Sequence, residues 1–146
     1  MELDPAYAPA RYFLAMCLLQ TGELDTAIAE LQKLVQELPE QPVAISGLAW
    51  ALGVSGRRAD SRRAADNLIN LAARVRVPSF FVAFALAWPG NEDEVLRLLE
   101  EAYREKFSWL LYLPIDPVFD FLRNNAHFQE LLRRLMAALR NQPTYS

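Results

Sequence analysis

The chain of 146 residues has little of what most metal and catalytic sites need, since it contains one cysteine and one histidine. Cys17 has no second cysteine with which to form an internal disulfide, a usage that fits a reducing compartment. One histidine and one cysteine do not supply the usual ligand set of a zinc site. We therefore expect no metal, no cofactor and no disulfide framework.

Other absences exclude further classes of protein. There is no glycine-rich phosphate loop among the five glycines, and the start of the chain lacks the basic and apolar regions of a signal peptide. The longest apolar stretch, VPSFFVAFALAWP, is shorter than the roughly 20 residues that a bilayer span needs. A net charge of −3 gives no basic footprint for nucleic acid. We expect a cytoplasmic protein with no membrane and no nucleic-acid partner.

The few candidate catalytic groups have simpler structural interpretations. His127 stands at the start of the last predicted helix, where it is a capping or solvated residue, and Cys17 stands among leucines as a small hydrophobe. The carboxylates of GNEDEV complement a helix N-terminus. Because no nucleophile or acid–base pair is apparent, we expect that the chain is not an enzyme.

A repeat with a period of 34 residues organises the sequence. The residues that recur at this spacing are glycines, small residues and leucines: Gly22, Gly56 and Gly90; Ala15, Ala49 and Ala83; Leu18, Leu52 and Leu86. In each unit the apolar and small residues predict a first helix, and the glycine ends it. A second helix follows, with Asp25, Asp60 and Asn91 as capping candidates.

This pattern resembles the tetratricopeptide repeat over about residues 2–108, although Arg11, Ile45 and Ser79 replace its leading tryptophan. Ser61 and Val95 replace the alanine that Ala27 preserves, and Ala73 and Phe107 replace the closing proline. The resemblance implies an all-α fold, a right-handed superhelix of three helix pairs at about 8–41, 42–75 and 76–109. Residues 1–108 would form the repeat domain.

The period stops after the third unit, and residues 109–146 are predicted to form a helical C-terminal cap and a short tail. We expect short helices at about 108–113 and 118–123, and then a longer helix that begins after Asn124 or Asn125. A repeat array needs a terminal element of this kind, with a polar outer face.

The ending L-x-x-DP-x-FD-x-LR…F-x-x-LL resembles the C-terminal tetratricopeptide regions of bacterial multidomain signalling proteins, which include cyclase-like proteins and winged-helix regulators of the CadC type. This second resemblance covers about residues 41–136. It implies a regulatory domain that packs against another domain of its own polypeptide. Because ELDP at the start is typical of the end of a repeat, we expect the chain to be a C-terminal piece of a longer protein.

By resemblance to the family, the first helices line a concave groove that binds a partner. The positions carried over are Tyr12, Met16, Ser46, Trp50, Phe80, Phe84 and Trp88, flanked by Gln20 and Val54. The lysine, asparagine and arginine of family members that clamp a C-terminal carboxylate are missing. The remaining set is apolar and aromatic, which predicts a protein–protein interaction scaffold. Its partner would be an amphipathic helix or peptide, a domain of the same polypeptide, or a second copy of the chain.

Two structural alternatives accompany these assignments. In a tight superhelix the large aromatic side chains would fill the groove themselves. The second concerns a possible basic patch at the glycine turn of the second unit, formed by Arg57, Arg58, Arg62 and Arg63. These arginines are either a solvated edge or a docking site for an acidic partner.

Overall fold

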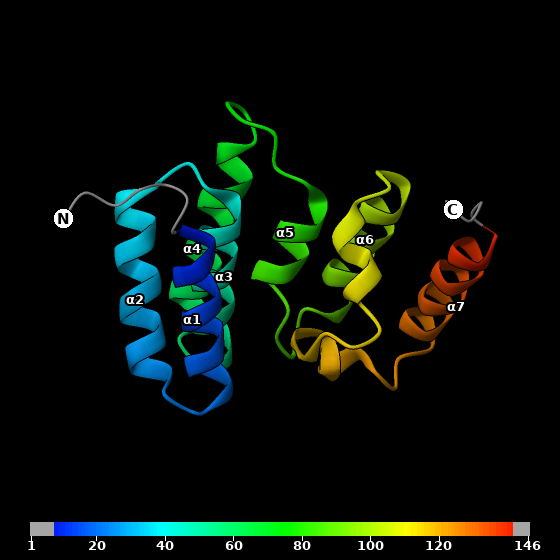
Figure 1. Ribbon diagram of the computed structural model, residues 1–146, viewed down its shortest axis with the longest axis horizontal. Helices are drawn as coiled ribbons and strands as arrows, with labels where there is room; N and C mark the ends of the chain where they lie inside the picture. Colours follow the sequence, from blue (N-terminus) through cyan, green and yellow to red (C-terminus); the bar gives the residue numbers. More distant parts are fainter. Residues whose placement is uncertain (1–7, 142–146) are drawn as a thin grey trace.

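The computed structural model describes residues 8–141, with side chains from Leu14 onward, and this part of the chain contains helices and no strand. The α-helices are α1 (Ala8–Gln20), α2 (Leu24–Glu37), α3 (Pro42–Val54), α4 (Arg58–Leu71), α5 (Ser79–Ala85), α6 (Glu92–Arg104) and α7 (Ala126–Arg140). Two 3₁₀ helices, η2 (Ser108–Tyr112) and η3 (Pro117–Leu122), connect α6 to α7. The predicted all-α helical-repeat fold is confirmed (Figure 1).

Gly22 and Gly56 follow the ends of α1 and α3, as the sequence predicts, whereas Gly90 lies in the turn between α5 and α6. Gly22, Gly56 and Gly90 have φ values of 86°, 92° and 109°, which glycine adopts without steric cost. The residue after the glycine then bonds back to the helix in the first two pairs. Glu23 N donates to Leu18 O and Arg57 N donates to Leu52 O, each at 2.9 Å. The chain therefore reverses in the same way in both pairs.

The third pair departs from this regularity because α5 has only seven residues. It begins after Pro78 and ends at Ala85, and the chain then turns until α6 begins. This early end brings Trp88 against Gly53 of α3, where a Cβ atom would overlap the indole ring. The Trp88 Nε1–H donates to Ser61 Oγ of α4 at 3.0 Å. The shortened helix thus inserts a large side chain between α3 and α4.

Two clusters of buried apolar residues form the core. One joins α1, α2 and α3 around Leu31, and the other runs from α3 through α5 and α6 to α7. Met16 and Trp50 pack against both clusters. The first helix pair is therefore connected by packing to the rest of the molecule.

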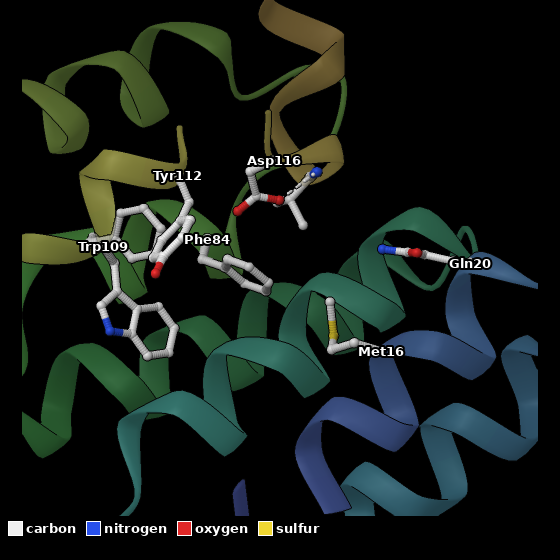
Figure 2. Close-up of a pocket in the computed structure, with 8 residues that line it drawn as sticks. Met16, Gln20, Phe84, Trp109, Tyr112 and Asp116 are labelled. Carbon is white, nitrogen blue, oxygen red and sulfur yellow. Dashed lines mark hydrogen bonds between the residues drawn. The ribbon is translucent and has the colours of Figure 1, made fainter. Parts of the chain in front are cut away.

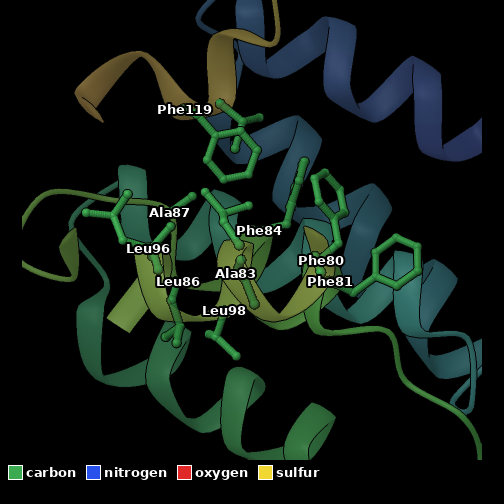
Figure 3. Packing of buried hydrophobic residues seen from close by; sticks show 14 of the residues in the cluster. Phe80, Phe81, Ala83, Phe84, Leu86, Ala87, Leu96, Leu98 and Phe119 are labelled. Carbon is green, nitrogen blue, oxygen red and sulfur yellow. The ribbon is translucent and has the colours of Figure 1, made fainter. Parts of the chain in front are cut away.

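The helices of the C-terminal segment lie within a residue or two of the places that the sequence predicts. Asp116 Oδ1 accepts from Val118 N at 3.0 Å at the start of η3, and Asn125 Oδ1 accepts from Phe128 N at 3.1 Å at the start of α7. Phe119 of η3 lies against Phe80 and Phe84 of α5, with ring centroids 5.8 and 6.4 Å apart. The segment therefore turns back onto the repeats instead of only extending them (Figure 3).

Candidate functional site

A pocket of about 570 Å³ lies between the first helix pair, α5 and the C-terminal segment. Its lining residues come in pairs from four elements: Met16 and Gln20 of α1, Phe80 and Phe84 of α5, Trp109 and Tyr112 of η2, and Asp116 and Val118 from the start of η3. Figure 2 shows these side chains facing a common space. We call this the α1–η3 pocket.

Aromatic rings form most of one wall of the pocket. Phe80 and Phe84 are almost fully buried at its base. Trp109 packs edge-on against Phe80 and Phe81, with centroids 6.1 and 5.2 Å apart, which holds its indole in place. Tyr112 is 62% exposed at the rim. The pocket thus has a rigid aromatic base and an accessible aromatic edge.

Asp116 is the one acidic residue among the described residues of this lining. Its carboxyl group is partly buried, and burial raises its pKa above the ordinary value of 3.8. The hydrogen bond from Val118 N and the positive charge of Arg123 oppose this rise without cancelling it. In Figure 2 the Asp116 carboxylate projects toward the side of the pocket where Phe84 and Tyr112 lie. The site therefore combines apolar surface with one negative charge.

The structure brings together some of the groove residues that the sequence singles out. Met16, Phe80 and Phe84 line the pocket, and the flanking residue Gln20 lies beside Met16. The backbone of Tyr12 lies in α1, but its side chain is outside the described residues. Residues that are 60 or more positions apart, on α1 and α5, thus contribute to one pocket.

Ser46 and Trp88 require a correction, because the structure places both in the core. Ser46 is fully buried and donates to Val43 O at 2.8 Å within its own helix. Trp88 is 7% exposed and lies against Gly53, since α5 ends before this residue and the helical register no longer applies. Neither residue lines the α1–η3 pocket.

Trp50 occupies an intermediate place. It is half-buried, its Nε1–H donates to Ala87 O at 2.8 Å, and its ring lies 5.8 Å from that of Phe84. The aromatic residues of α3 and α5 therefore pack on one another and on Phe119, and they do not form the broad exposed surface expected from the sequence. A double Trp50→Ala, Phe84→Ala change would remove core packing as well as groove surface.

The arginines of the predicted basic patch are paired within the chain. Asp60 bonds Arg57 at 3.0 Å and also Arg63, and Glu94 of α6 bonds Arg62 at 3.2 Å. The guanidinium of Arg58 lies 5.5 Å from the centroid of the Trp88 ring. These contacts favour the interpretation of a solvated edge over a free anion site.

The half of the pocket that the C-terminal segment supplies is not predicted from the sequence. Trp109, Tyr112, Asp116 and Val118 lie in a stretch interpreted only as a cap. A signal was present, because WLLYLPIDP has more aromatic and apolar residues than an outward-facing cap requires. The spacing of these residues does not predict that the segment turns back onto the repeats.

Two other kinds of site are absent from the described part of the chain. Across residues 8–141, the His, Cys, Asp and Glu side chains form no group of three or more that could hold a metal ion. No helix in this range has both the length and the apolar character needed to cross a bilayer. The α1–η3 pocket therefore remains the main candidate.

Comparison with known proteins bears on the first third of the chain. A tetratricopeptide repeat model matches residues 1–51, a range that ends within α3. No curated protein and no solved structure gives a significant match. The beginning of the chain is thus similar to a tetratricopeptide repeat, and the helices α4, α5 and α6 follow the matched range.

Proposed function

We propose that this protein is a non-catalytic interaction module that binds a peptide or helix of a partner protein in the α1–η3 pocket. Tetratricopeptide repeats generally mediate protein–protein interaction, and the match over residues 1–51 supports that general role. We further propose that three repeats, at about 8–41, 42–75 and 76–109, act with the C-terminal segment as one binding unit in the cytoplasm.

The observation that carries this proposal is the composition and size of the pocket. A volume of about 570 Å³ lies within the roughly 300–1,000 Å³ typical of ligand sites. Its base is apolar, and its rim includes the exposed side chains of Gln20 and Tyr112. An extended or helical segment can insert apolar side chains at the base while its backbone stays at the rim.

Site-specific photo-crosslinking tests the proposal. Benzoylphenylalanine replaces Tyr112 at the rim in one variant, and Ile69 in a matched control, in cells of the source organism. Ile69 is 46% exposed on α4 and does not line the pocket. We expect a distinct crosslinked protein from the Tyr112 position alone, which mass spectrometry then identifies.

The identity of the crosslinked species separates the remaining alternatives. A crosslink to another protein supports a partner in trans. A crosslink within a longer form of the same polypeptide supports the intramolecular regulatory domain of a bacterial signalling protein, and a crosslink between copies supports a homodimer. The same pattern from Tyr112 and Ile69 would contradict binding at the pocket.

A further inference from the structure

We propose that the α1–η3 pocket recognises a lysine or arginine side chain carried by an otherwise apolar peptide segment, with Asp116 as the counter-ion. This inference rests on the proposed function and specifies the chemistry of the partner. The charges are the opposite of those in a carboxylate clamp, because here the protein supplies the carboxylate and the peptide supplies the cation.

Charge complementarity selects the occupant. Among the described lining residues, Asp116 is the only one with a carboxyl, ammonium or guanidinium group, and the other lining side chains are apolar, aromatic or an uncharged amide. An acidic segment would meet like charge in a partly buried site. A wholly apolar segment would bury the charge of the carboxylate further without an ion-pair partner, which is costly. A segment with one basic side chain among apolar residues can pack its apolar residues on the floor of the pocket and pair its positive charge with the carboxylate of Asp116.

The neighbouring arginine of the chain does not neutralise this carboxylate directly. Arg123 Nη1 donates to the carbonyl oxygens of Leu113 and Pro114, and its Nη2 donates to the backbone oxygen of Asp116 at 2.7 Å. Its Nε donates to the carboxylate of Asp120 at 3.0 Å. These bonds direct the donors of Arg123 to the backbone of the turn and to Asp120.

The aromatic residues around Asp116 also favour a cation. Phe84 and Tyr112 lie on the side toward which its carboxylate projects, and Trp109 lies beyond Tyr112 (Figure 2). The faces of aromatic rings attract ammonium and guanidinium groups, most strongly where water is excluded. The apolar stem of lysine or arginine can meanwhile pack on the same rings.

The carboxylate must be ionised for this role, which gives binding a pH dependence. Burial raises the pKa of Asp116, so the ionised form is depleted as the pH falls toward and below that raised value. The charged or titratable groups near it are Arg123 and Asp120 on the η3 side and Tyr112 on η2, while the described side chains of α1 and α5 contribute no such group to the lining. We expect the affinity for a basic peptide to fall with acidification through this range.

Selection from a random peptide display library tests the inference. The wild-type protein is compared with Asp116→Asn, which removes the charge and keeps an oxygen to accept the Val118 N–H. Asp120→Asn is the matched control, because its exposed carboxylate lies on the same 3₁₀ helix but outside the pocket. We expect apolar peptides with one basic residue from the wild type and from Asp120→Asn. The preference for a basic residue should disappear with Asp116→Asn.

Calorimetry with one selected peptide makes the comparison quantitative. Replacing its lysine by norleucine, or its arginine by citrulline, should weaken binding to the wild type by about tenfold or more, as expected for loss of a charge-assisted hydrogen bond. The same replacement should have little effect on Asp116→Asn. Circular dichroism of each variant checks that the fold is retained.

The outcomes separate the inference from the proposed function. Tyr112→Ala alters the rim with little loss of packing, because this side chain is largely exposed. Selected peptides that lack a basic residue but lose affinity for Tyr112→Ala would overturn the cation assignment and leave the binding function in place. Peptides that bind wild type and Tyr112→Ala alike would overturn both. A basic preference that survives in Asp116→Asn would overturn the role of Asp116.

Discussion

At the residue scale, one set of contacts accounts for the residue types at three positions, which are Gly53, Ser61 and Trp88. The indole of Trp88 occupies the space that a side chain at position 53 would need, and its N–H donates to Ser61 Oγ. Ser61 in turn donates to Ala49 O at 2.6 Å, so the buried hydroxyl and indole are both hydrogen-bonded. Ser61 stands where the first repeat has Ala27, and this departure from the repeat pattern therefore has a structural cause.

Gly53→Ala is expected to destabilise the protein by about 1–3 kcal/mol, the usual cost of overpacking a core. The sign is informative, because alanine in place of glycine within a helix is ordinarily favourable by about 1 kcal/mol. Urea unfolding followed by circular dichroism measures the change. Val54→Ala, at a 40% exposed position on the same helix, is the control and should cost less. A stabilised Gly53→Ala protein would contradict the placement of Trp88.

At the scale of elements, Glu100 connects α6 to α7. Its carboxylate accepts from Arg134, and its Oε1 lies 2.9 Å from His127 Nε2. Its side chain is 17% exposed, so this ion pair is better shielded than the others on the surface. The hydrogen bond from Arg134 is the main cause that lowers the pKa of Glu100. Both partners lie on α7, which this carboxylate holds against α6.

Glu100→Gln should loosen α7 by about 1–2 kcal/mol, the size of a hydrogen bond to a charged group. We expect faster amide hydrogen exchange in α7 and unchanged exchange in α2, measured by mass spectrometry. Glu130→Gln is the control, because Glu130 is half-exposed and pairs with Arg133 within α7 itself. Equal effects of the two changes would show that Glu100 has no special role in docking.

Acidification should have the same effect as this substitution. Because the pKa of Glu100 in the folded protein lies below its ordinary value of 4.5, its stabilising contribution is complete above that value. The contribution is lost as the pH falls through the lowered pKa. The protection factors of α7 amides, which correct for the pH dependence of intrinsic exchange, should therefore fall in acid for the wild type and change less for Glu100→Gln.

The elements differ in how far the sequence predicts them. The helix ends at Gly22 and Gly56 follow from the left-handed conformation that glycine adopts, a local property. The start of α7 follows in the same way from the side-chain cap of Asn125. The early end of α5 cannot be predicted from the local sequence, because the apolar residues continue past the helix through Leu86, Ala87 and Trp88. What ends it is the packing of Trp88 against Gly53, a contact between residues 35 apart.

At the scale of the whole molecule, the site could be predicted only in part. The 34-residue period places Met16, Phe80 and Phe84 on related faces of first helices, and these residues do line the pocket. The other wall depends on the fold of residues 108–118, which has no periodic pattern and packs through tertiary contacts such as that of Phe119 with Phe80. Asp116, the residue that specifies the proposed partner, belongs to this wall.

The most direct test of the central claim, that a peptide occupies the α1–η3 pocket, uses the methionines as probes. The chain has three, of which Met16 lines the pocket and Met136 is 45% exposed on α7. Methyl spectra of carbon-13-labelled methionine would be recorded while a peptide selected on the wild-type protein is added. We predict that the Met16 signal shifts in proportion to occupancy while the Met136 signal stays in place. A shift of Met136 with an unchanged Met16 signal would contradict the account.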